Sequence, residues 1–254
     1  MLLQLATWQE VDEHLKTSRG IVVPIGSTEQ HGPTGFVGTD ALCPEILARG
    51  LSEEEGVMVA PTLSIGMAQH HLGFAGSITL RPTTLIAVVQ DVVNSLARHG
   101  FDSFFFLNGH GGNIAAVQSA FSEIYAEASL GRAGANRPAL RCHLRNWWDS
   151  DGVKELSAEL FGDAEGSHAT CSEVSLTYYG YPEHVKRAEM TPGRAPQGPI
   201  YDADDFRRRF PDGRMGSDPR LASVEAGARI YRTALDGIKS DYKAFLAGEE
   251  SDDD

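Results

Sequence analysis

The chain has 254 residues, 41% of them hydrophobic, which is enough apolar side chain for one large α/β domain with a full core. Its formal net charge of −13 argues against nucleic acids and anionic membranes as partners, because both repel an acidic surface. Three widely spaced cysteines, Cys43, Cys142 and Cys171, predict reduced thiols and not a disulfide framework or a zinc knuckle. No signal peptide opens the sequence and no apolar run reaches transmembrane length, so we expect a cytoplasmic protein without membrane contact.

Predicted strands and helices alternate through the first 146 residues. Residues 5–20 carry Trp8, Val11 and Leu15 at helical spacing, which predicts a short helix with one buried face. The uninterrupted apolar run at 104–107 is typical of a central parallel strand that is covered on both faces. Further strands are predicted at 21–25, 57–61 and 139–146, and helices at 83–99 and 114–129. This alternation indicates βαβ units, so we predict a single α/β domain with a mostly parallel central sheet flanked by helices.

The last third of the chain has a different composition. Residues 183–220 are rich in proline, glycine and charged residues, which predicts an irregular Pro/Gly-rich surface arm and not part of a core. A segment of this kind can also be an oligomer contact. A final helix is predicted at 221–246. We therefore expect one domain at 1–248, followed by a disordered acidic tail at 249–254.

Side chains of the types that bind metal ions follow two of the predicted strands. Glu29, His31 and Asp40 come after the strand at 21–25, and His110 follows the run at 104–107. Because the carboxyl ends of parallel strands meet at one edge of a sheet, we expect these side chains to converge. Carboxylates and imidazoles together suit zinc, manganese or iron(II), so the sequence indicates a metal site at this edge.

A second polar cluster lies further along the chain. Its members are Asp163, Glu165, His168 and Glu173. Glu173 could join the first group, but each candidate ligand also has a purely structural interpretation. Asp40 can be the N-cap of the helix that follows it, and His110 can be a hydrogen-bonded turn residue. Glu173 can be a capping-box glutamate after Thr170.

The turn N-G-H-G-G-N at 108–113 joins a predicted strand to a predicted helix. Glycines on both sides of His110 let the backbone approach a ligand closely. Such a turn could also bind a phosphate at the helix N-terminus. It lacks the lysine of a P-loop and does not fit G-x-G-x-x-G, so nucleotide binding is not favoured.

Three motifs are distinctive in combination. They are G-S-T-E-Q-H-G-P at 26–33 with G-T-D at 38–40, N-G-H-G-G-N at 108–113, and G-S-H-A-T-C-S-E-V-S at 166–175. Together they resemble the creatininase (creatinine amidohydrolase) family over roughly residues 5–182. The resemblance implies a single α/β domain with a binuclear metal centre that holds zinc with manganese or iron. It also implies a homo-oligomer, a hexamer in this family, with residues 190–220 as the expected contact arm.

The resemblance further implies a role for each metal-binding candidate. Glu29 and His110 would bind one metal ion and His31 would bind the other. Asp40 would bridge the two ions. Glu29 would thereby also belong to the catalytic residues.

The family's proton-transfer histidine corresponds to His168, which is the second expected catalytic residue. Trp148 matches an aromatic wall of the family's substrate pocket. The complete set of expected substrate contacts is Trp148, His71, Ser77 and Gly111.

Three departures from creatininases proper weigh against creatinine itself as the substrate. Their turn reads H-Y-E-N, with the tyrosine on the substrate and the glutamate on a metal, whereas this chain has Gly111 and Gly112. Glu173 then becomes the candidate for the missing carboxylate ligand. A lid tryptophan of the family is replaced by Ala164, and the pocket floor ahead of Gly76 also differs.

From these residues and the resemblance, we predict a metal-dependent amidohydrolase that cleaves the C–N bond of a small cyclic or linear amide. A hydroxide that bridges two divalent ions would attack the carbonyl, and His168 would pass a proton to the departing nitrogen. Relatives with H-G-G-N include formamide deformylases and a peptide-maturing protease, which are the alternatives within the family. A catalytically silent, metal-stabilised oligomer that acts as a binding protein is an alternative of another class. The retained His168 counts against it.

Overall fold

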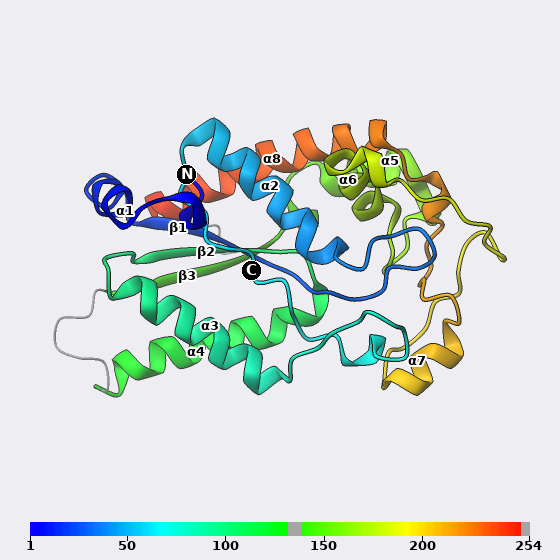
Figure 1. The fold of residues 1–254 in the computed structure, drawn as a ribbon, viewed down its shortest axis with the longest axis horizontal. Helices are drawn as coiled ribbons and strands as arrows, with labels where there is room; N and C mark the ends of the chain where they lie inside the picture. Colours follow the sequence, from blue (N-terminus) through cyan, green and yellow to red (C-terminus); the bar gives the residue numbers. More distant parts are fainter. Residues whose placement is uncertain (132–138, 250–254) are drawn as a thin grey trace.

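The structure is a computed structural model, and it describes residues 1–131 and 139–249. Three parallel strands form a sheet in the order β1-β2-β3, and their bounds are β1 (Gly20–Ile25), β2 (Ser103–Asn108) and β3 (Arg141–Asn146). Ile25, Asn108 and Asn146 are in register, so all three strands end at the same edge of the sheet. The predicted α/β architecture with a parallel sheet is confirmed (Figure 1).

Helices surround this sheet. In chain order, the α-helices of the described residues are α1 (Trp8–His14), α2 (Thr39–Glu55), α3 (Pro82–Ala97), α4 (Ile114–Ser129), α5 (Val153–Phe161), α6 (Cys171–Gly180), α7 (Ala203–Arg209) and α8 (Val224–Ala247). Four of them, α2, α3, α4 and α8, cover the two faces of the sheet (Figure 1). In Figure 1, α3 and α4 lie below the strands, and α2 and α8 lie above them. The predicted helices at 83–99, 114–129 and 221–246 correspond to α3, α4 and α8.

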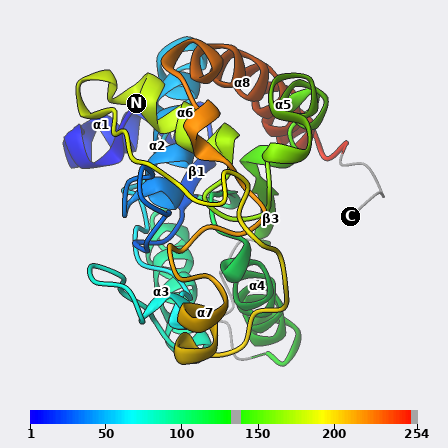
Figure 2. The ribbon, with the colours of Figure 1, turned by 90° about the vertical axis from the view of Figure 1, so that its right-hand side faces the viewer.

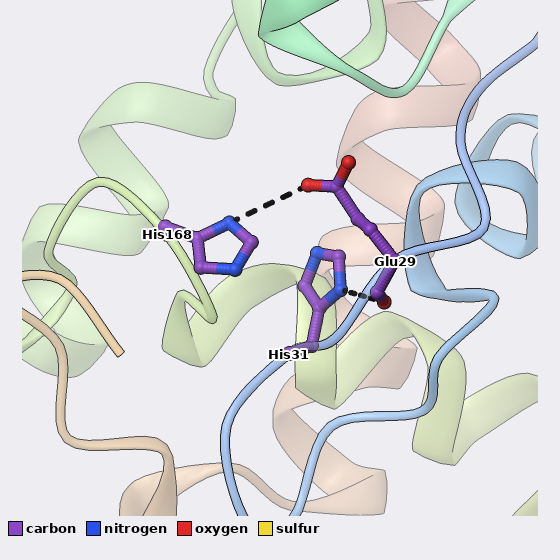
Figure 3. Close-up of side chains that lie close together, drawn as sticks. All are labelled: Glu29, His31 and His168. Atoms are coloured by element: carbon purple, nitrogen blue, oxygen red, sulfur yellow. Dashed lines mark hydrogen bonds and ion pairs between the residues drawn. The ribbon is translucent and has the colours of Figure 1, made fainter. Parts of the chain in front are cut away.

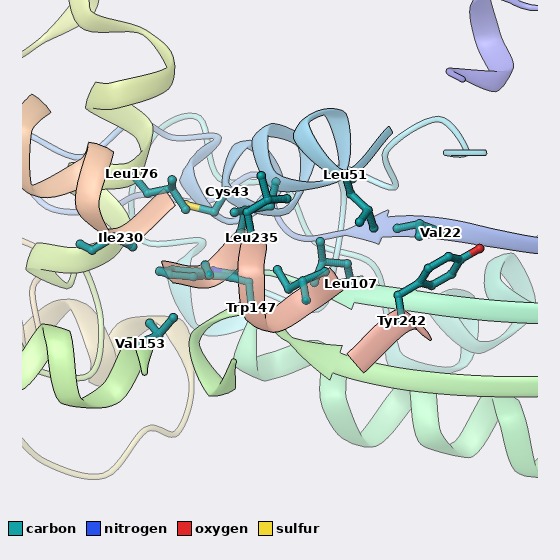
Figure 4. Close-up of a cluster of buried hydrophobic side chains, with 14 of the residues drawn as sticks. Val22, Cys43, Leu51, Leu107, Trp147, Val153, Leu176, Ile230, Leu235 and Tyr242 are labelled. Atoms are coloured by element: carbon teal, nitrogen blue, oxygen red, sulfur yellow. The ribbon is translucent and has the colours of Figure 1, made fainter. Parts of the chain in front are cut away.

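The side chains of β2 divide the core into two layers. Phe104 and Phe106 pack into the cluster formed with α3 and α4, whereas Phe105 and Leu107 pack into the cluster formed with α2 and α8. Figure 4 shows the second of these clusters. All four side chains are fully buried, and each such burial stabilises the fold by roughly 1.5–3 kcal/mol. A strand that is covered on both faces explains the uninterrupted apolar run in the sequence.

The segment predicted as a strand at 57–61 forms only isolated bridges beside β1, so that prediction is wrong. Val22 donates a hydrogen bond to the carbonyl of Met58 and accepts one from the amide of Ala60, both at 2.9 Å. Pro24 has no N–H group and interrupts the ladder, and pairing resumes only as the isolated bridge between Ile25 and Leu63. The segment therefore lies along β1 without extending the sheet as a regular strand.

The first helix is shorter than predicted, and the expected burial of Trp8 is wrong. A capping box between Thr7 and Glu10 begins α1 at Trp8, whose side chain is 71% exposed. Val11 and Leu15 are partly buried and pack against the core as expected. Only the second half of the predicted face therefore contributes to the core.

The prediction that 183–220 contributes nothing to a core is also wrong. Helix α7 places Phe206 against Phe210 and Met215 in a small buried cluster. In Figure 2, which is seen from the side where the strands end, the irregular segments of the arm cross in front of the sheet, and α7 lies in front of α3 and α4. The arm therefore packs against the rest of the domain near this edge.

Arg214 secures the C-terminal part of the arm from inside. Its guanidinium is fully buried and donates to the carbonyls of Pro192, Gly193 and Ser217 and to the Asp212 carboxylate. The sequence did not indicate that the arm is packed in this way, because its composition is rich in proline and charged residues. Hydrogen bonds to a buried charged group hold this segment in place of apolar contacts.

Two further observations bear on the sequence predictions. Cys43, Cys142 and Cys171 are thiols and not parts of disulfides, as expected. Within residues 1–131 and 139–249, none of the helices has both the length and the apolar content needed to cross a membrane. Residues 250–254 of the predicted acidic tail lie outside the described residues.

Arg214→Met should destabilise the protein by roughly 3–5 kcal/mol, because it leaves Asp212 and several carbonyls without their buried partner. The matched control is Arg208→Met in α7, whose side chain is 71% exposed and pairs with Asp205 at the surface. That change should cost no more than about 1 kcal/mol. Urea unfolding of both variants measures the difference, and equal losses would contradict the role given to Arg214.

Candidate metal centre

Four separate segments bring the five predicted ligands together. Glu29 and His31 lie in the loop after β1, and His110 follows β2 directly. Asp40 and Glu173 occupy the first turns of α2 and α6. All five side chains are buried, none being more than 9% exposed. The convergence expected from the ends of parallel strands is therefore found, and α6 supplies one more carboxylate.

These residues form two groups of three that share Asp40. The ligand atoms of Glu29, Asp40 and His110 lie within 4.8 Å of one another, and so do those of His31, Asp40 and Glu173. Oδ1 of Asp40 is 2.9 Å from Nε2 of His31, and Oδ2 is 2.8 Å from Nδ1 of His110. The two oxygens of one carboxylate thus face two different groups, as a bridging ligand requires.

The backbone of Asp40 is held between two glycines. A Cβ added to Gly26 or Gly109 would lie 2.1 or 1.9 Å from the carbonyl oxygen of Asp40. Only glycine permits this approach of the ends of β1 and β2 to α2. The N-cap interpretation of Asp40 is wrong, because the N-cap is Gly38 and no side chain caps this helix.

Glu173 has the structural role that was considered as an alternative, and it also faces the cluster. Its Oε1 accepts a hydrogen bond from the amide of Thr170 at 2.5 Å, and the Thr170 hydroxyl accepts one from the amide of Glu173. The same Oε1 is 3.8 Å from Nε2 of His31. The capping box therefore fixes this carboxylate beside His31, and the two interpretations are compatible.

His110 likewise combines a turn with a place in the cluster. Its amide donates to Oδ1 of Asn108 at 3.1 Å, and Nδ2 of Asn108 donates to the carbonyl of His110 at 2.8 Å. The imidazole extends the other way, with Nε2 3.0 Å from the carbonyl of Met67 and 3.4 Å from Oε2 of Glu29.

The carboxylates control the ionisation of the cluster. Burial lowers the pKa of His31, but Asp40, Glu173 and Glu29 outweigh it and raise that pKa to about 10. Burial also lowers the pKa of His110, and Glu29 and Asp40 raise it to about 9. Burial raises the pKa of Glu173 to about 7, against the opposing effect of His31. The carboxylates therefore attract positive charge to this buried site, in the form of protons or metal ions.

Two buried carboxylate oxygens indicate that these residues fit a metal ion. Oε1 of Glu29 and Oδ2 of Asp40 have no hydrogen-bond partner in the part of the chain that the structure describes. Nε2 of His71 and Nδ1 of His110 lie only 3.0 and 2.8 Å from them, but not in hydrogen-bonding alignment. A buried, unpaired carboxylate oxygen is costly, and a cation shared by these groups would satisfy both. The donor set fits zinc, manganese or iron.

His168 lies against the same cluster, with its ring centroid 4.5 Å from that of His31 and 4.3 Å from that of His71. Its Nε2 is 2.9 Å from the carbonyl of Gln30 and 3.0 Å from the side-chain nitrogen of Gln30. The two hydrogens of that amide are directed to His71 and Gly213, so we assign the imidazole hydrogen to Nε2, where it is donated to the carbonyl. Nδ1 keeps its lone pair and faces Oε1 of Glu29 at 3.9 Å (Figure 3). Burial, with His31 and His71, lowers the pKa of His168 well below its usual value, so the ring is neutral.

Gln30 is a site residue that the sequence analysis missed. Its side-chain amide donates to Nδ1 of His71 and to the carbonyl of Gly213, both at 2.9 Å, and its Oε1 accepts from the amide of Gly32. This side chain thus connects the arm to the histidines. Its position between Glu29 and His31 was the available signal, but an amide is not a usual metal ligand.

A pocket of about 580 Å³ opens onto this cluster. Of the expected substrate contacts, Trp148, His71 and Gly111 line it. Ser77 does not; its hydroxyl accepts a hydrogen bond from the amide of Gln30 at 3.1 Å. Ile200 from the arm also lines the pocket, and no signal in the sequence indicated this.

A family model described as creatinine amidohydrolase matches residues 4–240. The chain belongs to the creatininase family. Creatinine amidohydrolase of Pseudomonas putida is 27% identical to it, over 91% of this chain and 92% of that protein. The mycofactocin precursor peptide peptidase of Mycolicibacterium smegmatis is 32% identical, over 89% and 85% respectively. The chain is therefore a creatininase-family amidohydrolase.

Solved structures agree with the fold. A crystal structure of creatinine amidohydrolase matches with a TM-score of 0.82 and 23% identity, over 98% of both chains. Two further creatininase structures, with TM-scores of 0.80 and 24% identity, are named as a zinc–zinc type and a manganese form. They cover 94% of this chain and 95% and 96% of their own.

Asp40→Asn should lose bound metal, because a neutral amide cannot compensate two divalent ions as a shared carboxylate can. Protein purified without chelator should contain about two metal equivalents per chain in the wild type and fewer than one in this variant. Glu45→Gln on the same helix, where the carboxylate pairs with Arg49, is the control and should keep both. Elemental analysis measures the content; an Asp40→Asn protein with the full complement would remove Asp40 from the centre.

Proposed function

We propose that the chain hydrolyses an amide C–N bond with two divalent metal ions in the buried cluster. Glu29, Asp40 and His110 would hold one ion, and His31, Asp40 and Glu173 would hold the other. The observation that carries this proposal is the pair of residue groups that meet at Asp40. A single tetrahedral zinc ion needs no more than four ligands, and five are gathered in this cluster.

When bound, such ions lower the pKa of water and polarise the amide carbonyl, which supplies a nucleophile near neutral pH. The residues of the chain prepare the site for this step. Ser27 donates to Oε2 of Glu29 at 2.8 Å, and the carbonyl of Glu29 lies 3.0 Å from Nδ1 of His31. These hydrogen bonds orient the two side chains before a substrate enters.

His168 would move the proton. With its hydrogen on Nε2 held by the carbonyl of Gln30, its Nδ1 can accept a proton from the attacking water. It can then return this proton to the departing nitrogen, which is a poor leaving group as an anion. A silent binding protein would have no use for this arrangement, which supports an enzyme. His168 also forms a group of three with Glu29 and His31 within 4.8 Å, so metal content must be measured alongside activity.

For the metals, we propose zinc with manganese or iron, supported by the donor set and by the zinc and manganese named in related structures. For the substrate, a peptide-like amide is the second candidate beside a small cyclic or linear one. It is favoured by the 32% identity to a peptide peptidase over 89% of the chain. The hexameric assembly and the cytoplasmic location remain predictions.

His168→Ala should keep both metal ions and slow the cleavage of an unactivated amide by roughly 10²–10⁴-fold, the usual contribution of a positioned acid or base. The loss should be much smaller for a nitroanilide, because that leaving group needs little protonation. His184→Ala, whose side chain is 61% exposed, is the control and should behave as wild type.

Turnover of both substrates, metal content and melting temperature are measured together for these variants. Equal slowing of the two substrates by His168→Ala would end the proton-transfer assignment. Loss of one metal equivalent would instead make His168 a ligand.

A further inference from the structure

An open space borders Gly111 in the pocket wall. A Cβ built on Gly111 meets no heavy atom within 4 Å, and Gly111 is not among the glycines with positive φ. The adjacent Gly112 is different, because its added Cβ would lie 2.4 Å from Nε2 of His110 and 2.6 Å from the carbonyl of Met67. Local packing therefore requires glycine at 112 but not at 111, and the missing side chain at 111 only enlarges the pocket.

Two tryptophans line the same pocket as Gly111. Asn108 and Asn146 are in register, so the turn that carries Gly111 lies beside the turn that carries Trp147 and Trp148. The two indole rings are 6.2 Å apart at 85°, and both residues line the pocket. Flat aromatic walls of this kind favour a planar ligand group.

The pocket wall combines polar and apolar side chains. The buried cluster of carboxylates and histidines lines it, and so do the two tryptophans with Val153, Ala158 and Ile200. The pocket volume of about 580 Å³ is in the range of pockets that enclose drug-sized ligands. A compact amide of a few atoms at the cluster would leave most of this volume filled with water.

We propose that the space beside Gly111 is a subsite for a large, planar, apolar group attached next to the scissile amide. The substrate class is then aryl or similarly bulky amides, and Gly111 is the residue that admits them. This inference rests on the proposed function, because the metal centre would hold the amide against the cluster.

Binding of three hydroxamic acids to zinc-reconstituted full-length protein tests the subsite without relying on turnover. A hydroxamate chelates the metal and holds its substituent where that of the substrate would lie. Acetohydroxamic, benzohydroxamic and 2-naphthohydroxamic acids give a series of increasing size, measured by titration calorimetry. From the methyl to the naphthyl compound, wild-type affinity should rise roughly ten- to hundredfold, because burial of an aromatic ring contributes that much.

Gly111→Leu should reduce this gain to less than about threefold, because the leucine fills the space. Ala115→Leu is the control: it adds the same bulk one turn along, at an exposed position outside the pocket, and should keep the full gain. Zinc content and melting temperature check that each variant is folded. Gly111→Ala, which meets nothing within 4 Å, serves as a second variant with an intermediate gain.

The outcomes separate the subsite from the proposed function. Binding of acetohydroxamic acid without any gain for the ring compounds would overturn the subsite and leave the metal-centred function standing. A full gain in Gly111→Leu would overturn the assignment to Gly111. If zinc-containing wild type binds none of the three, the metal-centred function fails, and the subsite fails with it.

Discussion

The burial of three carboxylates in one cluster is the constraint on which the rest of this structure depends. Glu29, Asp40 and Glu173 are at most 9% exposed, and such groups persist away from water only where opposite charge or hydrogen-bond donors compensate them. The parallel sheet meets this requirement by ending all its strands at one edge, where loops can gather side chains from distant segments. Helices α2 and α6 add carboxylates from their first turns, where the helix dipole also favours negative charge.

Much of the fold was predictable because its strongest signals are local. The apolar run around Phe105 and the periodic faces of α3, α4 and α8 are recorded in consecutive residues. Where tertiary context decides, the sequence was insufficient. The segment at 57–61 has strand composition, but Pro24 in the neighbouring strand β1 interrupts the pairing and leaves isolated bridges. The prediction that the arm lies outside the core was wrong, because the sequence does not distinguish a buried arginine with main-chain partners from a solvated one.

The candidate metal site was also predictable only in part. Ligand types at strand ends predicted the gathering of Glu29, His31, Asp40 and His110, but only the family motif indicated which carboxylate would bridge. Nothing in the sequence distinguishes Glu173 as a helix cap from Glu173 beside His31, and the structure shows that one carboxylate does both. Ser77 was assigned to the pocket, but it supports the backbone of Gln30 instead. Contacts between a side chain and the backbone of a site residue depend on loop geometry, which the spacing of residues in the sequence does not predict.

The arm contacts the histidines at several points, and this has a consequence for how this family can diversify. Gly213 accepts a hydrogen bond from Gln30, His168 pairs with Met215, and the buried ring of Phe206 lies 4.6 Å from that of His71. Ile200, earlier in the same arm, borders the pocket, and the exposed residues at 198–202 around it can be exchanged without changing these contacts. Evolution can therefore redraw the entrance by changing one loop while the inherited chemistry beneath it stays intact.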